Sequence, residues 1–264
     1  MATSGTRSPS RARITARTLR TDRWWLEPLV TAAVLFAFVV YATYRAFSGE
    51  NYFAEPYLSP LYSPCVTTAC VEGSAHLGTQ IGSWWPWSPA LLILVIPLSL
   101  RLTCYYYRKA YYRSFWLSPP ACAVAEPHRG YSGETRFPLI LQNVHRYALY
   151  LALAYNLLLF YDAVLSFRSP EGEWGHMGLG SLILVINAVL LALYSASCHS
   201  CRHIIGGRLR NFSRHPIRYR AWGIVTRLNT KHPHIAWISL VFVAFTDFYV
   251  WMVASGTIAD PRFF

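Results

Sequence analysis

Five long apolar segments are the feature that most constrains the fold of this chain. Each has about the 20 residues that a helix needs to cross the hydrocarbon core of a bilayer. The first follows Trp24 and Trp25, an interfacial aromatic pair, and its residues 29–40 carry no charge. The pattern predicts an all-α integral membrane protein with five transmembrane helices, at about residues 26–47, 89–107, 144–167, 177–197 and 234–257. Residues 24–257 would then form one membrane anchor, flanked by a basic tail (1–23) and a short tail (258–264).

The charges lie in the gaps between these segments and predict an orientation. The net charge is +12, although only 14% of the residues are charged. Six Lys or Arg residues lie in 1–23, five in 108–143 and eight in 200–233, whereas 48–88 holds none and the remaining loop holds only Arg168. The positive-inside rule therefore places the N-terminus in the cytoplasm and the C-terminus outside, in a multi-pass protein of the plasma membrane. Basic residues confined to such loops are explained by the membrane topology and by attraction to anionic lipid. We therefore expect no nucleic-acid partner.

Two cysteines, Cys65 and Cys70, lie in the loop that this orientation puts outside. Disulfides persist in that oxidising compartment, so we predict a structural Cys65–Cys70 bond that closes a small loop.

Two thiols and two imidazoles fall within six residues at the end of the fourth apolar segment: Cys198, His199, Cys201 and His203. In a continuing helix the thiols share one face and the imidazoles share another. Such ligands can hold zinc, an iron–sulfur centre or haem iron, or can do dithiol chemistry. The alternative is a helix end with two buried thiols and two interfacial histidines.

The predicted topology brings further Cys and His residues to the same membrane depth. Cys104 ends the second segment, His145 begins the third, and Cys122 follows a Pro119-Pro120 turn that could fold back toward them. Because helix ends converge in a bundle, we predict a metal or redox centre there. Its four ligands would come from Cys104, Cys122, Cys198, Cys201, His145, His199 and His203.

Three kinds of centre fit this supply of ligands. A Rieske-type 2Fe–2S cluster takes two Cys on one iron and two His on the other, and Cys201-Arg202-His203 matches half of its usual motif. Haem b would instead use His145 with His199 or His203 as axial ligands. Zinc is the third.

Two further patterns suggest chemistry in the membrane. The stretch 101–113 interleaves five tyrosines with cations, which is typical of an interfacial belt and also suits a quinone pocket formed by Tyr105, Tyr106, Arg108 and Tyr111. Asp247 lies inside the last segment, where acids are costly and usually paired or functional, so it could relay protons.

Several of these stretches together resemble a known family. They are residues 18–25 before the first span, 62–65 in the external loop, the tyrosine-rich 104–112, His145-Arg146-Tyr147, and 198–203. The chain resembles the membrane-anchor protein of an actinobacterial succinate dehydrogenase, of the kind found in mycobacteria. The resemblance covers essentially all of the chain beyond the arginine-rich tail.

This resemblance implies that the chain anchors a flavoprotein subunit and an iron–sulfur subunit, passes electrons to menaquinone, and is not active alone. The whole complex could form a higher oligomer. Better-known five-span anchors carry two b haems held by four His, but this sequence has no His in the outer half of its spans. The actinobacterial type is understood to carry a membrane-embedded Rieske-type centre, which implies two ligands from the four cysteines and two from the three histidines named above.

Two other functions compete with the anchor. A stand-alone thiol oxidoreductase could present Cys198 and Cys201 to quinone, but such enzymes usually act on the oxidising side, opposite to these thiols. A transporter is disfavoured because the sequence shows no internal repeat.

Overall fold

The computed structural model describes residues 20–78, 83–124, 127, 139–169 and 171–263. Most of the predicted tail (1–19), a stretch of the basic loop (128–138) and Phe264 lie outside the described residues. Within them, four helices are long and apolar enough to cross a membrane, and a fifth span results if one bent helix pair is counted as a span. The four are α1 (Leu26–Ser48), α5 (His145–Leu165), α6 (Leu179–Ala196) and α9 (His232–Ala254).

The second span is broken where we predicted one helix over 89–107. It consists of α2 (Pro89–Ile93), α3 (Val95–Thr103) and α4 (Tyr105–Phe115), and the chain bends by 77° between α3 and α4. Pro97 explains the first break, because it has no N–H to donate to the carbonyl of Ile93 and its ring crowds that carbonyl. The other spans begin and end within three residues of the predicted bounds.

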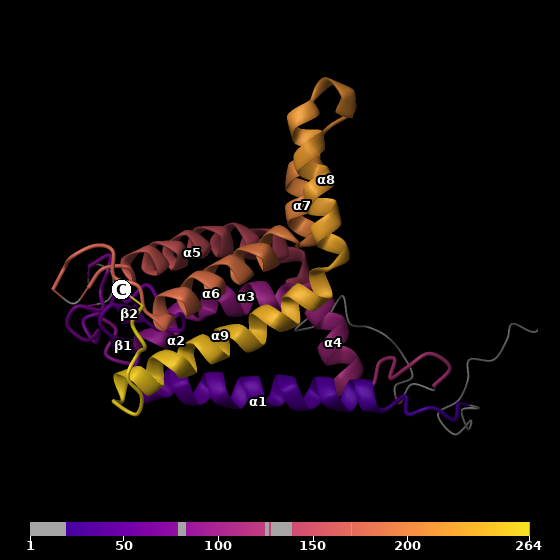
Figure 1. Ribbon diagram of the computed structural model, residues 1–264. Coiled ribbons are helices and arrows are strands. Elements are labelled where there is room, and N and C mark those ends of the chain that lie inside the picture. The colour runs from indigo at the N-terminus through magenta and orange to yellow at the C-terminus, as the bar shows by residue number, and fades with distance from the viewer. Residues whose placement is uncertain (1–19, 79–82, 125–126, 128–138, 170, 264) are drawn as a thin grey trace, which may run out of the picture.

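The long helices run side by side, and α1 lies at the edge of the bundle (Figure 1). Helices α3, α5, α6 and α9 pack on one another in the order α3–α5–α6–α9. Only 6% of the apolar window of α1 is buried, against 44% for α5, α6 and α9. We expect α1 to be exposed mainly to lipid.

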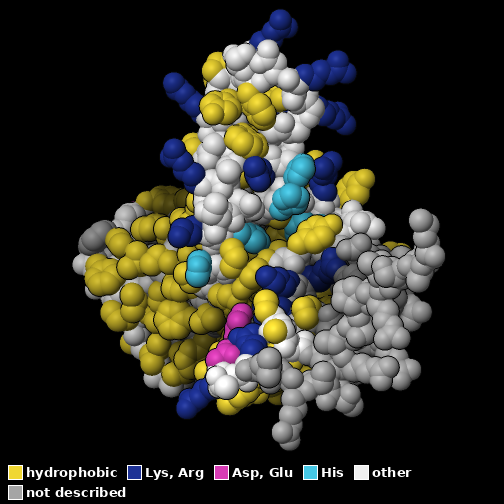
Figure 2. All heavy atoms as spheres, turned by 90° about the vertical axis from the view of Figure 1, so that its right-hand side faces the viewer, with side chains coloured by type: hydrophobic (Ala, Val, Ile, Leu, Met, Phe, Trp, Pro, Cys, Tyr) yellow, Lys and Arg dark blue, Asp and Glu magenta, His cyan; other side chains and the backbone are white. Residues whose placement is uncertain are grey.

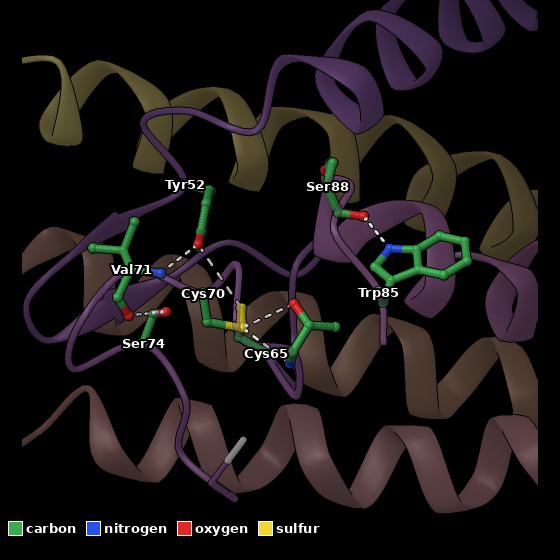
Figure 3. Close-up of a disulfide and its surroundings, with 8 residues drawn as sticks. Tyr52, Cys65, Cys70, Val71, Ser74, Trp85 and Ser88 are labelled. Atoms are coloured by element: carbon green, nitrogen blue, oxygen red, sulfur yellow. Dashed lines mark hydrogen bonds between the residues drawn. A yellow bond between two sulfur atoms is a disulfide. The ribbon is translucent and has the colours of Figure 1, made fainter. Parts of the chain in front are cut away.

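One end of the bundle, here called the disulfide end, is capped by residues 49–78 (Figure 3). Cys65 and Cys70 form the disulfide bond that the sequence suggested. The short antiparallel strands β1 (Phe53–Ala54) and β2 (Tyr57–Leu58), which were not predicted, lie in the same cap. The rings of Tyr52 and Tyr62 stack 4.1 Å apart, and the Tyr52 hydroxyl accepts a hydrogen bond from the Val71 N–H at 2.7 Å. The cap is thus a packed unit rather than an open loop.

Two carboxylates, of the buried Asp162 and the partly buried Asp260, attach this cap to the helices. Asp162 of α5 contacts His76 Nδ1 at 2.6 Å and accepts a hydrogen bond from Ser63. Asp260, in the C-terminal tail, accepts hydrogen bonds from the Tyr57 hydroxyl at 2.7 Å and from the Gly180 N–H at 2.8 Å. The second contact places a negative charge at the N-terminus of α6, where the helix dipole favours it.

The opposite end, here called the basic end, carries elements that leave the bundle sideways. Helices α7 (His199–Gly206) and α8 (Pro216–Thr230) form a hairpin that projects in one direction, while α4 turns away in another (Figure 1). Lys and Arg side chains surround this hairpin, and His side chains gather near its base (Figure 2). A 3-10 helix at Leu139–Val144 leads into α5 beside it.

Candidate functional site

Four helix junctions meet at the basic end and bring Cys and His side chains together. Cys104 lies at the break between α3 and α4, and Cys198 at the break between α6 and α7. His145 and His232 are the first residues of α5 and α9. All four are buried, with exposed fractions of 2%, 3%, 3% and 7% for Cys104, Cys198, His145 and His232.

The two cysteine junctions have nearly the same local structure. Cys104 (φ −66°, ψ 128°) and Cys198 (φ −64°, ψ 143°) are both extended N-cap residues of the helix that follows. Each directly follows a hydroxyl residue, Thr103 or Ser197. Each thiol therefore lies at a helix N-terminus, where free backbone N–H groups and the positive end of the helix dipole point toward it.

The contacts cross between these junctions in two equivalent sets. His145 Nε2 lies 2.9 Å from Cys198 Sγ, and its Nδ1 lies 2.8 Å from the Thr103 hydroxyl. His232 Nε2 lies 3.4 Å from Cys104 Sγ, and its Nδ1 lies 2.8 Å from the Ser197 hydroxyl. Each imidazole is therefore oriented by a hydrogen bond at Nδ1, as metal-binding histidines commonly are. Its Nε2 faces a cysteine sulfur.

Burial and the helix N-terminus act in opposite directions on Cys198. Burial raises the pKa of this thiol to about 12, although the N–H groups of Ser200 and Cys201 oppose the change. The apo thiol is therefore protonated at neutral pH. Metal binding at Cys198 would have to displace this proton, so it would be coupled to proton release.

The donor set suits a binuclear centre better than a single metal ion. Among the described residues, no three His, Cys, Asp or Glu side chains converge on one ion position. A mixed-ligand 2Fe–2S centre requires only two protein ligands on each iron, two thiolates on one and two imidazoles on the other. Cys104, Cys198, His145 and His232 supply that set from a buried, hydrogen-bonded environment.

Comparison with known proteins identifies the family. The family described as actinobacterial succinate dehydrogenase subunit SdhC matches residues 26–256. The chain belongs to this family. It is also similar to a chain in the solved structure of the Mycobacterium smegmatis Sdh1 complex in the apo form, with 57% identity and a TM-score of 0.88 over 97% of this chain and 98% of that chain. No curated protein matches significantly.

The family membership confirms the resemblance drawn from the sequence. The SdhC-family chain is a multi-pass membrane subunit of a succinate dehydrogenase, and other subunits of that complex are expected beside it.

The remaining predicted ligands lie apart from the two Cys–His contacts. His199 and His203 are exposed on α7 and contact each other, with ring centroids 4.4 Å apart. Cys201 is half-buried on the same helix, and Cys122 is exposed. Tyr105 contacts the rings of both His145 and His199, so this phenol lies near the pair proposed for haem.

The four residues predicted to form a quinone pocket differ in their surroundings. The Tyr106 hydroxyl accepts a hydrogen bond from Trp237 Nε1 at 2.6 Å, and the Tyr111 hydroxyl donates to the Leu102 carbonyl at 3.5 Å. Tyr105 is 49% exposed. Arg108 follows Tyr107 on α4, and none of the four lines the cavity of about 340 Å³ that residues of α1, α3, α5 and α6 help to enclose.

Asp247 lies in a buried ion pair at the disulfide end. Arg45 Nε is 2.8 Å from its carboxylate, and the two side chains are 2% and 0% exposed. Tyr41 and Ser59 each donate a hydrogen bond to the same carboxylate at 2.5 Å. The proton relay stays a prediction, but these contacts show a charge that is fully paired.

His232 is the main residue that the sequence reasoning missed. We expected the last span to begin at 234, whereas α9 begins two residues earlier and so carries the His232 ring into the bundle. The available signal was positional: His145 and His232 both begin a span at the basic end, and Cys104 and Cys198 both follow a hydroxyl residue.

Proposed function

We propose that this member of the SdhC family passes electrons from the soluble subunits of succinate dehydrogenase to quinone, through a Rieske-type 2Fe–2S centre held by Cys104, Cys198, His145 and His232. The observation that carries this proposal is the crossed pair of Cys–His contacts at four helix junctions. Cys104, Cys198 and His145 were among the predicted ligands, and His232 takes the place of His199 or His203.

The charge distribution supports an orientation for this function. The basic end would face the cytoplasm, because it carries the loops 108–143 and 200–233. The iron–sulfur subunit, with the flavoprotein subunit beyond it, would then dock on the same end, where cationic side chains are displayed (Figure 2). A centre at the four junctions would lie just beneath that surface, and electrons would reach it by a short path.

The chain's own residues have defined tasks in this scheme. Oxidation of succinate to fumarate releases two electrons and two protons, and reduction of a quinone to a quinol consumes the same numbers. The bound cluster would accept and pass on single electrons. Thr103 and Ser197 fix the orientation of the two imidazoles, while burial of all four ligands excludes water and lowers the local dielectric.

Paired variants of the purified complex test the ligand set. His232→Ala, Cys104→Ser and Cys198→Ser should each remove one 2Fe–2S equivalent of iron and acid-labile sulfide per complex. His203→Ala and Cys201→Ser change the same residue types on α7 and should leave both contents unchanged. Loss of iron and sulfide in the α7 variants, with retention in the first three, would refute the assignment.

A further inference from the structure

Arg101, in the last turn of α3, is a cation inside the bundle whose charge is not balanced by a nearby carboxylate. Its side chain is partly buried and lines the cavity that α1, α3, α5 and α6 help to enclose. Among the described residues, no ion pair joins its guanidinium to an Asp or Glu, whereas Arg45 is paired with Asp247. A cation within a membrane protein is costly and is usually either paired or functional. The charge of Arg101 therefore requires an explanation.

The contacts of the guanidinium direct it into the protein. Its Nη1 donates to the Tyr107 hydroxyl at 2.5 Å and to the Ala236 carbonyl at 3.4 Å, and its Nη2 donates to the Ser239 hydroxyl at 3.2 Å. Ala236 and Ser239 belong to α9, so the side chain points across the bundle, whereas a cation at a helix end commonly extends to the lipid headgroups. All three acceptors are neutral, and they leave the positive charge uncompensated.

This charge lies beside the four proposed ligands, here called the Cys–His site. Arg101 precedes Cys104 by one helical turn, and its carbonyl accepts a hydrogen bond from the Cys104 N–H at 3.2 Å. The guanidinium carbon lies 4.6 Å from the centroid of the Tyr194 ring, and the same ring stacks on His232 with centroids 5.2 Å apart. These two distances place the guanidinium carbon within about 10 Å of the centroid of the His232 ring.

The proposed centre would supply the missing negative charge. A 2Fe–2S core held by two thiolates and two neutral imidazoles has a net charge of zero when both irons are ferric. One electron from the soluble subunits reduces one iron to the ferrous state and takes this charge to minus one. A fixed cation nearby stabilises the more negative state. At a distance of about 10 Å and an effective dielectric constant of about 20, a unit charge shifts such an equilibrium roughly tenfold.

We propose that Arg101 is a positioning residue whose fixed charge stabilises the reduced centre and raises its reduction potential. It ligates neither iron and acts through the electric field that it sets up at Cys104 and His232. A higher potential makes the centre a better acceptor for electrons that leave the soluble subunits. This inference rests on the proposed function, because the centre provides the charge that Arg101 stabilises.

Arg101→Met in the purified complex removes the charge and keeps an unbranched side chain. The groups that Arg101 contacts retain other partners, since the Tyr107 and Ser239 hydroxyls both donate to the Ala236 carbonyl, at 2.7 and 3.1 Å. We therefore expect the iron and acid-labile sulfide contents to stay unchanged. A redox titration followed by EPR should show a lower midpoint potential. The expected change is roughly tenfold in the ratio of reduced to oxidised centre at a given potential, equivalent to about 59 mV for one electron.

Two controls separate the charge of Arg101 from its packing and from the general basicity of this end. Arg101→Lys keeps the charge but loses the planar guanidinium, and should restore most of the native potential. Arg227→Met removes a cation that is exposed on α8, where water and salt screen it, and should leave the potential unchanged. If Arg101→Met loses iron, Arg101→Gln takes its place, because it is neutral and can still donate hydrogen bonds.

The outcomes distinguish this inference from the proposed function. A neutral variant with a full cluster and the native potential would overturn the role of Arg101 while the ligand assignment stands. An equal drop in Arg101→Lys and the neutral variant would overturn it too, because packing rather than charge would then set the potential. A native complex without any 2Fe–2S signal from this chain would refute the proposed function itself.

Discussion

At the scale of single residues, the hydroxyls of Thr103 and Ser197 are as informative as the four proposed ligands. Each bonds the Nδ1 of one histidine and thereby fixes which nitrogen faces sulfur. Groups that orient metal ligands in this way typically contribute about 10–100-fold to metal affinity.

We therefore expect Ser197→Ala to weaken retention of the cluster about 10–100-fold without removing a ligand. The measurement is the rate of cluster loss from the purified complex in the presence of an iron chelator. Ser99→Ala is the control, because the Ser99 hydroxyl donates only to the Ile96 carbonyl of its own helix. Equal rates in the two variants would show that the hydroxyl does not support His232.

The Arg45–Asp247 pair makes a second prediction at this scale. Asp247→Leu leaves the buried guanidinium without its counter-ion and should cost about 3–5 kcal/mol of stability. The double variant Arg45→Met/Asp247→Leu should recover much of this loss, since it leaves no buried charge. Thermal unfolding of the purified complex measures both. A proton relay through Asp247 predicts a different result for Asp247→Asn, namely near-normal stability with an altered pH dependence of turnover.

At the scale of elements, the disulfide and the Cys–His site lie at opposite ends of the bundle, so we expect them to be stabilised independently. The Cys65–Cys70 bond closes a short loop, for which chain entropy alone gives about 2 kcal/mol. Cys65→Ser/Cys70→Ser should lower the unfolding midpoint but leave the iron and sulfide contents intact, because the site lies at the other end of the bundle. Cys122→Ser, at an exposed free thiol, is the control and should change neither. Loss of the cluster in the double variant would show that the two ends are coupled.

The spans could be predicted from the sequence because lipid imposes a length and a polarity on each of them. The break at Cys104 could not be predicted from the sequence. Residues on both sides of it form helices, and the chain changes direction only where α4 meets the end of the bundle. Cys122 was predicted because its Pro-Pro turn could fold back toward the helix ends, and His203 because it lies in the Cys-His stretch. In the structure both side chains are exposed, Cys122 in the loop and His203 on α7. Arg45 and Asp247 are 202 residues apart, so only the packing of α1 on α9 reveals their pairing.

At the scale of the whole molecule, the asymmetry of charge between the two ends predicts the orientation in the membrane. A periplasm-dependent phosphatase fused after residue 264 should be active, whereas the same enzyme fused in the α7–α8 hairpin should be inactive. A fluorescent protein that folds only in the cytoplasm should give the reverse pattern at both positions. Activity of the phosphatase in the hairpin would invert the orientation and would leave the soluble subunits without the basic docking surface.

We propose that two thiolates and two imidazoles hold one 2Fe–2S centre at the basic end. Low-temperature EPR and optical spectra of the purified complex, before and after reduction, test this ligand set most directly. We expect a reduced 2Fe–2S signal whose average g value is lower than that of an all-cysteine cluster, lost in His232→Ala and kept in His203→Ala. Sharp b-type haem bands without such a signal, or neither feature, would contradict it.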